Sequence, residues 1–364
     1  MTLTHDGPEL VELQDEQQRR EWQSFVLSDL PEMISAMHVC HAVRAVADTP
    51  LLERLRSGPR RIADGLLAGI DPAIGTGFLR YLVQRGILET QGEEYGLTRL
   101  GEFLTTDVSL ARLGVYIDAY GAVTSRIGDL LTGKAVYGKD VIRDGAALGA
   151  HCDTLFTTFH SPVVSQAMRG RGVRKILDIG CGGGQLVIDA CLRDPSLTGI
   201  GLDISPEAIE VAGDLARRSG VADRVRFVVG DAFAPKTWPT ECLEADGLCI
   251  MSALHEHFRN GEQAVVDLLD EIAEMFPAQK ILLVGEPEIR YDGRENDDDF
   301  FLIHVLTGQG LPRDRSAWFD VFAKSTLHCR RVYTRPGAGP RICFYDLTTS
   351  GEQRKSGNPD DIQL

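Results

Sequence analysis

The chain lacks the features that mark membrane, secreted and nucleic-acid-binding proteins. No apolar run in its 364 residues approaches the roughly 20 residues that span a bilayer. The polar start, residues 1–20, has no apolar core of a signal peptide. Basic residues are outnumbered 38 to 53, and the net charge of −15 gives no general attraction for nucleic acid or anionic lipid. We therefore expect a cytoplasmic protein that binds small molecules, with no nucleic acid or membrane partner.

Cysteine is present but is not arranged for structural metal binding or disulfide formation. The absence of any Cys-x-x-Cys pair argues against a zinc ribbon or a disulfide framework and fits a reducing compartment. Internal repeats are also absent, while 43% hydrophobic and 25% charged residues are typical of a globular enzyme, and 364 residues favour two domains. The eight cysteines stand at positions 40, 152, 181, 191, 242, 249, 329 and 343.

The most informative stretch is Lys175-Ile-Leu-Asp-Ile-Gly-Cys-Gly-Gly-Gly184. Its first five residues predict a strand buried on both faces, and the glycines that follow let the backbone turn tightly against a ligand. A helix predicted over residues 185–192 would offer its N-terminal amides to an anionic group. Nucleotide-binding folds of several kinds share such a turn. The candidate cofactor residues here are Asp178, Gly180, Gly182 and Gly184.

Two further predicted strands end in acids. Residues 198–203 end in Asp203, 203 − 178 = 25 residues after Asp178, where a carboxylate can accept both hydroxyls of an adenosine ribose. Residues 225–231 end in Asp231, placed for the adenine amino group and followed by Ala232 and Phe233. The whole spacing resembles class I S-adenosylmethionine-dependent methyltransferases, whose Rossmann-like α/β domain would cover residues 155–348. A dinucleotide-binding dehydrogenase more often shows Gly-x-Gly-x-x-Gly.

The first 110 residues have a different character. Residues 33–46 and 75–85 have helical apolar spacing, and residues 86–98 predict a β-hairpin. Helix followed by hairpin is a winged-helix pattern, which leaves a DNA-binding regulator as an alternative. The segments 78–88 and 95–101 resemble the winged-helix dimerisation domain of small-molecule O-methyltransferases, and the resemblance implies a homodimer.

Linking helices are expected over residues 111–154 and a polar tail over residues 349–364. A helix over residues 116–131 would lie near the domain junction. Its polar side chains are candidate substrate contacts, although each also fits an ordinary solvated residue: Asp118, Tyr120 and Arg126.

A histidine follows the fourth strand, which is predicted over residues 245–252. His255 lies just beyond its end, where ligands bind in open α/β sheets. In the related O-methyltransferases a Leu-His-Asp or Leu-His-Asn segment supplies the base that removes the substrate hydroxyl proton, and His255 matches that position. Glu286, in the strand predicted over residues 281–287, matches an acid that such families have in the same region. These residues predict catalysis at His255 and Glu286.

The chain departs from the O-methyltransferase pattern after residue 300. His304 stands where an apolar residue is usual, and residues 308–315 replace a Gly-Gly-x-Glu-Arg-Thr signature. A lone histidine on an apolar face fits a hydrogen-bonded core residue. Together with His255 it also fits an open catalytic site for a transition metal, iron or zinc, with Glu256 and His257 as candidates for further ligands.

With histidines at both positions, the chain resembles the metal-assisted C-methyltransferases of α-keto acids, whose members act on phenylpyruvate, branched keto acids and 2-ketoarginine. The resemblance implies that the metal chelates the substrate carboxylate and keto oxygen and stabilises an enolate, whose C3 takes the methyl group. The product would be a 3-methyl-2-oxo acid of secondary metabolism. An O-methyltransferase that uses His255 as its base is the alternative.

Asp297 is the best sequence guide to the substrate side chain. It lies seven residues before His304, which on one helix is the same face and about 10 Å along the axis. A carboxylate there can hold a guanidinium through a bidentate pair, which favours 2-ketoarginine, with Glu256 as another substrate contact. The acidic run 297–299 also fits a helix cap, and Phe300 and Phe301 suit an aromatic or branched 2-oxo acid.

Overall fold

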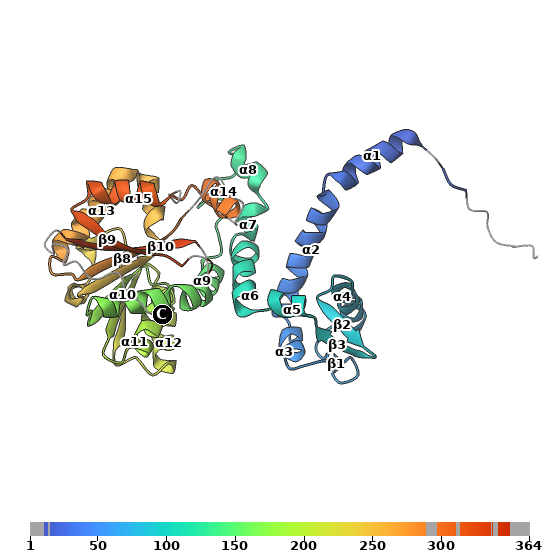
Figure 1. Ribbon diagram of the computed structural model, residues 1–364, viewed down its shortest axis with the longest axis horizontal. Helices are drawn as coiled ribbons and strands as arrows, with labels where there is room; N and C mark the ends of the chain where they lie inside the picture. The colour runs from blue at the N-terminus through green and yellow to red at the C-terminus, as the bar shows by residue number, and fades with distance from the viewer. Residues whose placement is uncertain are drawn as a thin grey trace, which may run out of the picture. The chain divides into compact units, whose positions relative to one another are not determined.

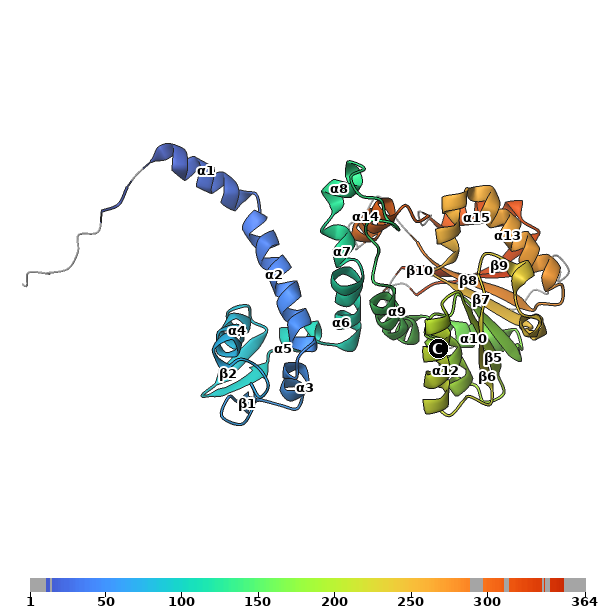
Figure 2. The same cartoon turned by 180° about the vertical axis from the view of Figure 1, so that it is seen from behind.

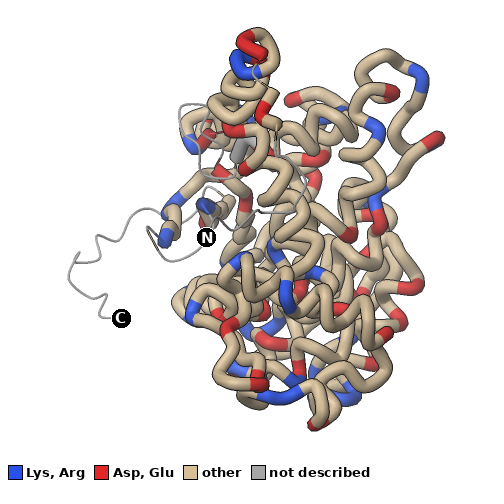
Figure 3. Tube along the Cα trace, turned by 90° about the vertical axis from the view of Figure 1, so that its right-hand side faces the viewer, with Lys and Arg blue, Asp and Glu red and all other residues tan. Residues whose placement is uncertain are grey.

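The computed structural model describes residues 11–13, 15–288, 297–310, 314–335, 337 and 341–349; of residues 297 and 298 it describes the backbone only. The chain forms two compact units, residues 1–113 and 114–364. Within the described ranges, no helix is both long enough and apolar enough to cross a membrane. Acidic and basic residues are interspersed along the chain (Figure 3). The tail expected over residues 349–364 lies outside the described residues, apart from Thr349.

The first unit combines helices with a small antiparallel sheet, β1-β3-β2 (Figure 1). Its core includes the buried side chains of Val46, Leu79 and Ile87. β2 and β3 pair as antiparallel neighbours, so the hairpin expected over residues 86–98 is confirmed. The elements are α1 (Glu16–Leu27), α2 (Leu30–Ala47), α3 (Leu51–Arg56), β1 (Arg60–Arg61), α4 (Pro72–Gln84), β2 (Leu88–Gln91), β3 (Glu94–Leu97), α5 (Arg99–Leu104) and α6 (Asp107–Gly114).

The second unit is built on a seven-stranded sheet in the order β6-β5-β4-β7-β8-β10-β9. The five strands from β6 to β8 are parallel, whereas β10 runs antiparallel to both of its neighbours. This is the Rossmann-like α/β fold that the sequence predicts. The strands are β4 (Lys175–Ile179), β5 (Thr198–Asp203), β6 (Val225–Val229), β7 (Gly247–Met251), β8 (Ile281–Pro287), β9 (Leu327–Tyr333) and β10 (Ile342–Thr349).

Helices cover both faces of this sheet (Figures 1 and 2). Leu177 of β4 joins an apolar cluster with α13 and α15, while its neighbour Ile176 joins a second cluster with α10 and α11. Successive residues of a strand point to opposite faces, so a strand covered on both sides needs apolar residues without interruption. The helices are η1 (Val115–Ala119), α7 (Gly121–Thr124), α8 (Ile127–Leu131), α9 (Gly145–Phe159), α10 (Ser161–Gly170), α11 (Gln185–Arg193), α12 (Pro206–Arg218), η2 (Pro235–Thr237), η3 (Thr240–Glu244), η4 (Leu254–Asn260), α13 (Glu262–Met275), α14 (Asp297–Thr307) and α15 (Arg315–Lys324).

The prediction of a single helix over residues 116–131 is wrong. The chain forms three short segments there, the π-helix η1 followed by α7 and α8. The breaks fall at Tyr120 and Arg126, whose φ angles of −107° and −116° leave the helical region. Short π-helical segments are often found at functional sites.

β4 is the strand at which the sheet order reverses. The chain adds β5 and β6 on one side of β4 and then returns to add β7 and β8 on the other. Ligands of such sheets bind beyond the carboxyl ends of the strands at this reversal. The ends of these five parallel strands therefore form the edge at which the candidate residues have to be sought.

Candidate active site

The glycine-rich turn after β4 has the backbone that its sequence predicts. Gly180, Gly182 and Gly184 have φ angles of 78°, 52° and 77°, in the left-handed region that favours glycine. Gly184 is also the N-cap of α11, whose first N–H groups have no partner within the helix. The start of α11 can therefore present free amides to an anionic group of a ligand.

Asp203 is the last residue of β5, and Asp231 lies just beyond the end of the neighbouring strand β6. One oxygen of Asp203 accepts a hydrogen bond from the Gly182 N–H at 2.9 Å, which holds the carboxylate against the turn. Asp231 Oδ1 accepts from the Phe233 N–H at 2.9 Å, which orders the segment that includes Ala232. The fold thus brings the predicted ribose and adenine acids to the same edge as the turn.

Asp178 lies in β4 and is 2% exposed. Its Oδ1 lies 3.3 Å from Cys249 Sγ, and its Oδ2 has no hydrogen-bond partner among the described residues. Burial raises the pKa of this carboxyl to about 7, and the nearby carboxylates of Asp203 and Asp153 act in the same direction. A buried oxygen without a partner is uncommon in native proteins, so it marks a position where a ligand group can bind.

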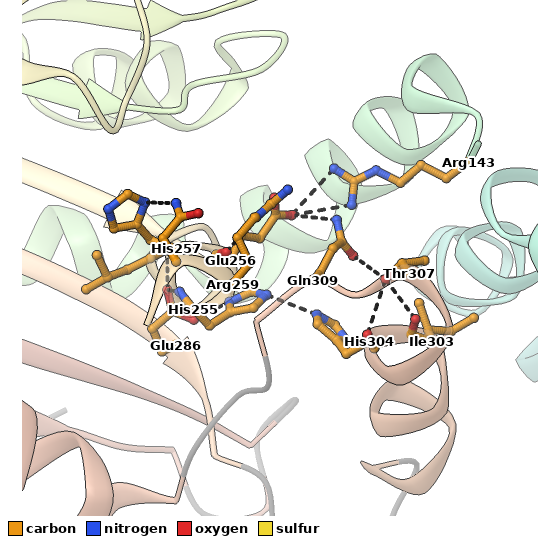
Figure 4. A network of polar contacts seen from close by, with 12 residues as sticks. Arg143, His255, Glu256, His257, Arg259, Glu286, Ile303, His304, Thr307 and Gln309 are labelled. Carbon is orange, nitrogen blue, oxygen red and sulfur yellow. Dashed lines mark hydrogen bonds and ion pairs between the residues drawn. The ribbon is translucent and has the colours of Figure 1, made fainter. Parts of the chain in front are cut away.

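His255 and His304 face each other in the interior (Figure 4). Their Nε2 atoms are 3.0 Å apart, and the side chains are 2% and 3% exposed. His255 lies in η4, just after β7, whereas His304 lies in α14. The segment that follows α14 passes close to η4. A Cβ added to Gly310 would lie only 1.7 Å from the His255 carbonyl oxygen, which shows how closely the two backbones approach. The departure from the O-methyltransferase signature thus includes a glycine that lets two backbones approach.

The other ring nitrogen of each histidine faces an acceptor. His304 Nδ1 lies 2.7 Å from the Phe300 carbonyl oxygen, and His255 Nδ1 lies 2.6 Å from Glu286 Oε2. A carbonyl only accepts hydrogen bonds, so His304 Nδ1 carries a proton, and an ionised Glu286 requires the same of His255. In two neutral rings, the Nε2 lone pairs would then face each other. A proton or a metal ion between them is needed to make that arrangement favourable.

Each of the two histidines has a buried environment that affects its ring: His255 contacts Glu286, and His304 has a lowered pKa. Glu286, at the end of β8, is fully buried, and its Oε1 accepts a hydrogen bond from the Leu254 N–H at 2.8 Å. Burial lowers the pKa of His304 to about 4, and His255 beside it contributes to the shift. His304 is therefore neutral at pH 7, the form in which imidazole binds metals.

A polar cluster adjoins the two histidines (Figure 4). Arg143 donates to the Tyr120 hydroxyl at 2.9 Å and lies 3.3 Å from Glu256 Oε1, which also accepts from Gln309 at 3.1 Å. Burial raises the pKa of Tyr120 to about 12, although Arg143 opposes the shift, so the hydroxyl keeps its proton. Arg143 was not predicted from the sequence, because a single arginine in a linking segment belongs to no motif.

The remaining predicted residues lie elsewhere or cannot be described. Arg126 pairs with Asp129 at 3.0 Å and does not join the cluster around Arg143. Asp118 lies 2.7 Å from His151. The ring of His257 stacks on that of Phe233, with the ring centroids 4.5 Å apart. His257 points away from His255 because η4 is a 3-10 helix, in which residues two positions apart point to different sides. The side chain of Asp297 lies outside the described residues.

Residues 173–294 match a family model described as a methyltransferase domain. The 2-ketoarginine methyltransferase of Streptomyces arginensis is 28% identical over 305 residues, which cover 80% of this chain and 85% of that protein. The indolepyruvate C-methyltransferase of Streptomyces griseus is 30% identical over 264 residues, which cover 70% of this chain and 75% of that protein. Human N-acetylserotonin methyltransferase, solved in complex with S-adenosylmethionine, has a TM-score of 0.69 at 17% identity and covers 93% of this chain and 99% of its own. At that identity the structural likeness shows the shared fold alone.

Proposed function

This chain belongs to the S-adenosylmethionine-dependent methyltransferases of the O-methyltransferase-like family, and we propose that it methylates carbon, not oxygen. The substrate is a 2-oxo acid, preferably 2-ketoarginine (5-guanidino-2-oxopentanoate). The methyl group passes from the sulfonium to C3, the C3 proton is lost, and the products are a 3-methyl-2-oxo acid and S-adenosylhomocysteine.

The observation that carries this proposal is the pair of facing Nε2 atoms, 3.0 Å apart. The distance from a metal ion such as zinc to an imidazole nitrogen is about 2.0–2.1 Å, so one ion can take both nitrogens as neighbouring ligands. The carboxylate behind His255 is the partner that metal-binding histidines usually have on their other nitrogen. The donor set of His255 and His304 therefore fits a divalent or trivalent transition metal, iron or zinc.

Two protein ligands make an open site. The described residues contain no group of three or more His, Cys, Asp or Glu side chains arranged to hold a metal ion. If a metal is bound by these two histidines, its other positions would be available to the substrate carboxylate and keto oxygen. A metal bound in this way would act as a Lewis acid that polarises the keto group and makes the C3 hydrogen more acidic.

The protein's own groups bind and orient the substrate. Glu286 fixes the ring of His255, so that Nε2 and not Nδ1 faces His304. Arg143 and the protonated Tyr120 can donate to the substrate carboxylate from a partly buried position, where charge-assisted hydrogen bonds are strong. Glu256 keeps Arg143 in this orientation through its ion pair. The turn after β4 holds the cofactor at the neighbouring strand end.

The relatives support a 2-oxo acid, and one of them supports 2-ketoarginine in particular. The names of both Streptomyces enzymes refer to 2-oxo acids, and the match to the 2-ketoarginine enzyme spans the larger share of both chains. Asp297 remains the predicted partner of the guanidinium. An aromatic or branched 2-oxo acid is the alternative at this pocket.

An O-methyltransferase that uses His255 as general base is the second candidate. The contact between His255 and Glu286 favours it, since a buried carboxylate stabilises the imidazolium that forms when a hydroxyl proton is taken. Against it, His304 occupies the Nε2 side of His255, from which the ring would have to reach the hydroxyl.

A panel of 2-oxo acids tests the proposed reaction. We expect purified protein with S-adenosylmethionine to add 14 mass units (roughly one CH₂) to 2-ketoarginine faster than to indolepyruvate or phenylpyruvate. Substrate deuterated at C3 should lose one deuteron in the product, because the new bond forms at that carbon. Methylation of a phenol or another hydroxyl, with all 2-oxo acids unchanged, would leave the O-methyltransferase as the function.

We also propose that the chain is a homodimer formed through its first unit. α1 has no buried residue, and exposed apolar side chains four positions apart recur along α1 and α2, including Trp22 and Val26, and Met33 and Met37. A contiguous apolar surface of this kind usually marks an interface. The resemblance of the first unit to a dimerisation domain makes a second copy the expected partner.

Light scattering tests the dimer. Wild type should have twice the 39.9 kDa mass of one chain, and Met37→Glu should shift the mass toward that of the monomer, because a carboxylate would be buried in an apolar contact. Ile74→Glu, at a residue of α4 that is 73% exposed, is the matched control and should stay dimeric. A monomeric wild type, or equal dissociation of both variants, would refute this interface.

A further inference from the structure

Asp153 is a carboxylate that reaches the cofactor turn from outside the family motif. It lies in α9, and a Cβ on Gly183 would lie 2.7 Å from Asp153 Oδ2. That distance is shorter than real contacts of a Cβ, so only glycine lets the carboxylate lie so close to the turn. Gly183 differs in this from the three glycines around it, whose positive φ angles already require glycine.

The turn is surrounded by carboxylates that lack a positive partner. Asp153 has no hydrogen bond or ion pair to the described residues, and burial raises its pKa to about 6. Asp178 is 2% exposed, and its Oδ2 has no partner within the described ranges. Asp203 acts electrostatically on Asp178 from the end of β5. Three partly or fully buried carboxylates at one turn are costly unless a cation binds among them.

The cofactor carries a cation of the required kind. The methionine portion of S-adenosylmethionine is a zwitterion with one ammonium and one carboxylate. Its carboxylate suits the free N–H groups at the start of α11, which repel the ammonium and favour the anion. The ammonium then has to bind on the side of the turn where the acids lie. Its three N–H donors match the two carboxylates that have unused oxygens.

We propose that Asp153, together with Asp178, binds the ammonium group of the methionine portion of the cofactor. A glycine at position 183 leaves the space that Asp153 needs to reach this ammonium group. Asp153 is then a cofactor-binding residue that no sequence motif indicates. The inference rests on the proposed function only for the identity of the cofactor, and it is independent of the metal and of the 2-oxo acid.

The affinities for two ligands, measured by calorimetry, test this assignment. S-adenosylhomocysteine contains the ammonium, whereas 5′-methylthioadenosine keeps the adenosine and the sulfur but lacks the amino acid. Asp153→Asn should weaken S-adenosylhomocysteine about ten- to 150-fold, the range expected for a lost hydrogen bond between charged groups, and leave 5′-methylthioadenosine unchanged. Asp214→Asn, which removes an equal charge from the exposed surface of α12, is the matched control and should bind both like wild type.

Gly183→Ala supplies a second test. Its Cβ should displace Asp153 and weaken S-adenosylhomocysteine in the wild-type background but add little in Asp153→Ala, because the side chain that it displaces is then absent. Equal losses for both ligands in Asp153→Asn would show a role in shaping the turn and overturn the proposal, as would unchanged affinity for S-adenosylhomocysteine. Wild type that binds neither ligand would refute the cofactor assignment itself, which is a different result.

Discussion

Replacing His304 by leucine should abolish metal binding at the proposed site and lower turnover of the 2-oxo acid about a thousandfold. The expected loss corresponds to ~4 kcal/mol of transition-state stabilisation, within the several kcal/mol that a Lewis acid supplies to a polarised carbonyl. Leucine is an apolar residue of the kind usual at this position in O-methyltransferases and has a similar volume to histidine. Metal content by mass spectrometry and initial rates measure the two effects together.

Binding of S-adenosylhomocysteine controls for misfolding of His304→Leu. It should be unchanged, since the turn after β4 does not contact His304. His328→Leu, at an exposed residue of β9, should keep both metal and turnover. A folded His304→Leu that retains its metal and methylates at the wild-type rate would disprove the metal site. A metal-free wild type, active on hydroxyl substrates and sensitive only at His255, would establish the O-methyltransferase instead.

Arg143→Gln should raise KM for the 2-oxo acid about a hundredfold with little change in the affinity for S-adenosylhomocysteine. A charge-assisted hydrogen bond to a carboxylate contributes roughly 1.5–3 kcal/mol, and the neutral side chain of glutamine cannot provide it. Arg143→Lys should recover only part of the loss, because an ammonium lacks the planar pair of donors. Steady-state rates over a range of 2-oxo acid concentration separate KM from kcat.

Arg126→Gln is the control for Arg143. Both arginines lie in the segment between the expected domains, and the sequence points to Arg126. In the fold Arg126 pairs with Asp129, whereas Arg143 contacts Tyr120 and Glu256 beside the histidines. We expect Arg126→Gln to change KM less than about twofold, as surface ion pairs contribute little. Equal effects of the two substitutions would contradict the assignment of the substrate carboxylate to Arg143.

The strands and the cofactor turn could be predicted because their signals are local. The apolar residues of β4, the positive φ angles at Gly180, Gly182 and Gly184, and an acid at or just beyond the end of β5 and of β6 all depend on short stretches of chain. His304 was identified as a candidate by one departure from a family pattern.

Arg143 and Asp153 could not be predicted in this way. Arg143 matters because Tyr120 and Glu256, 23 and 113 residues away, meet it in the fold. Asp153 matters because α9 packs beside the turn, and a carboxylate in a helical sequence gives no sign of that contact. The helix expected over residues 116–131 failed for a related reason, since apolar spacing does not reveal the changes in backbone angle at Tyr120 and Arg126.

On the proposed function, the 3.0 Å separation of the two imidazole nitrogens makes a proton and a metal ion competitors for one position. A hydrogen bond between the two rings needs a proton on one of the facing nitrogens, because two lone pairs cannot bond to each other. A metal ion that takes both nitrogens as ligands would have to displace such a proton, so loading the site would be an exchange of one cation for another. On the proposed function, the fraction of active enzyme then depends on the acidity of the solution in which the metal was acquired.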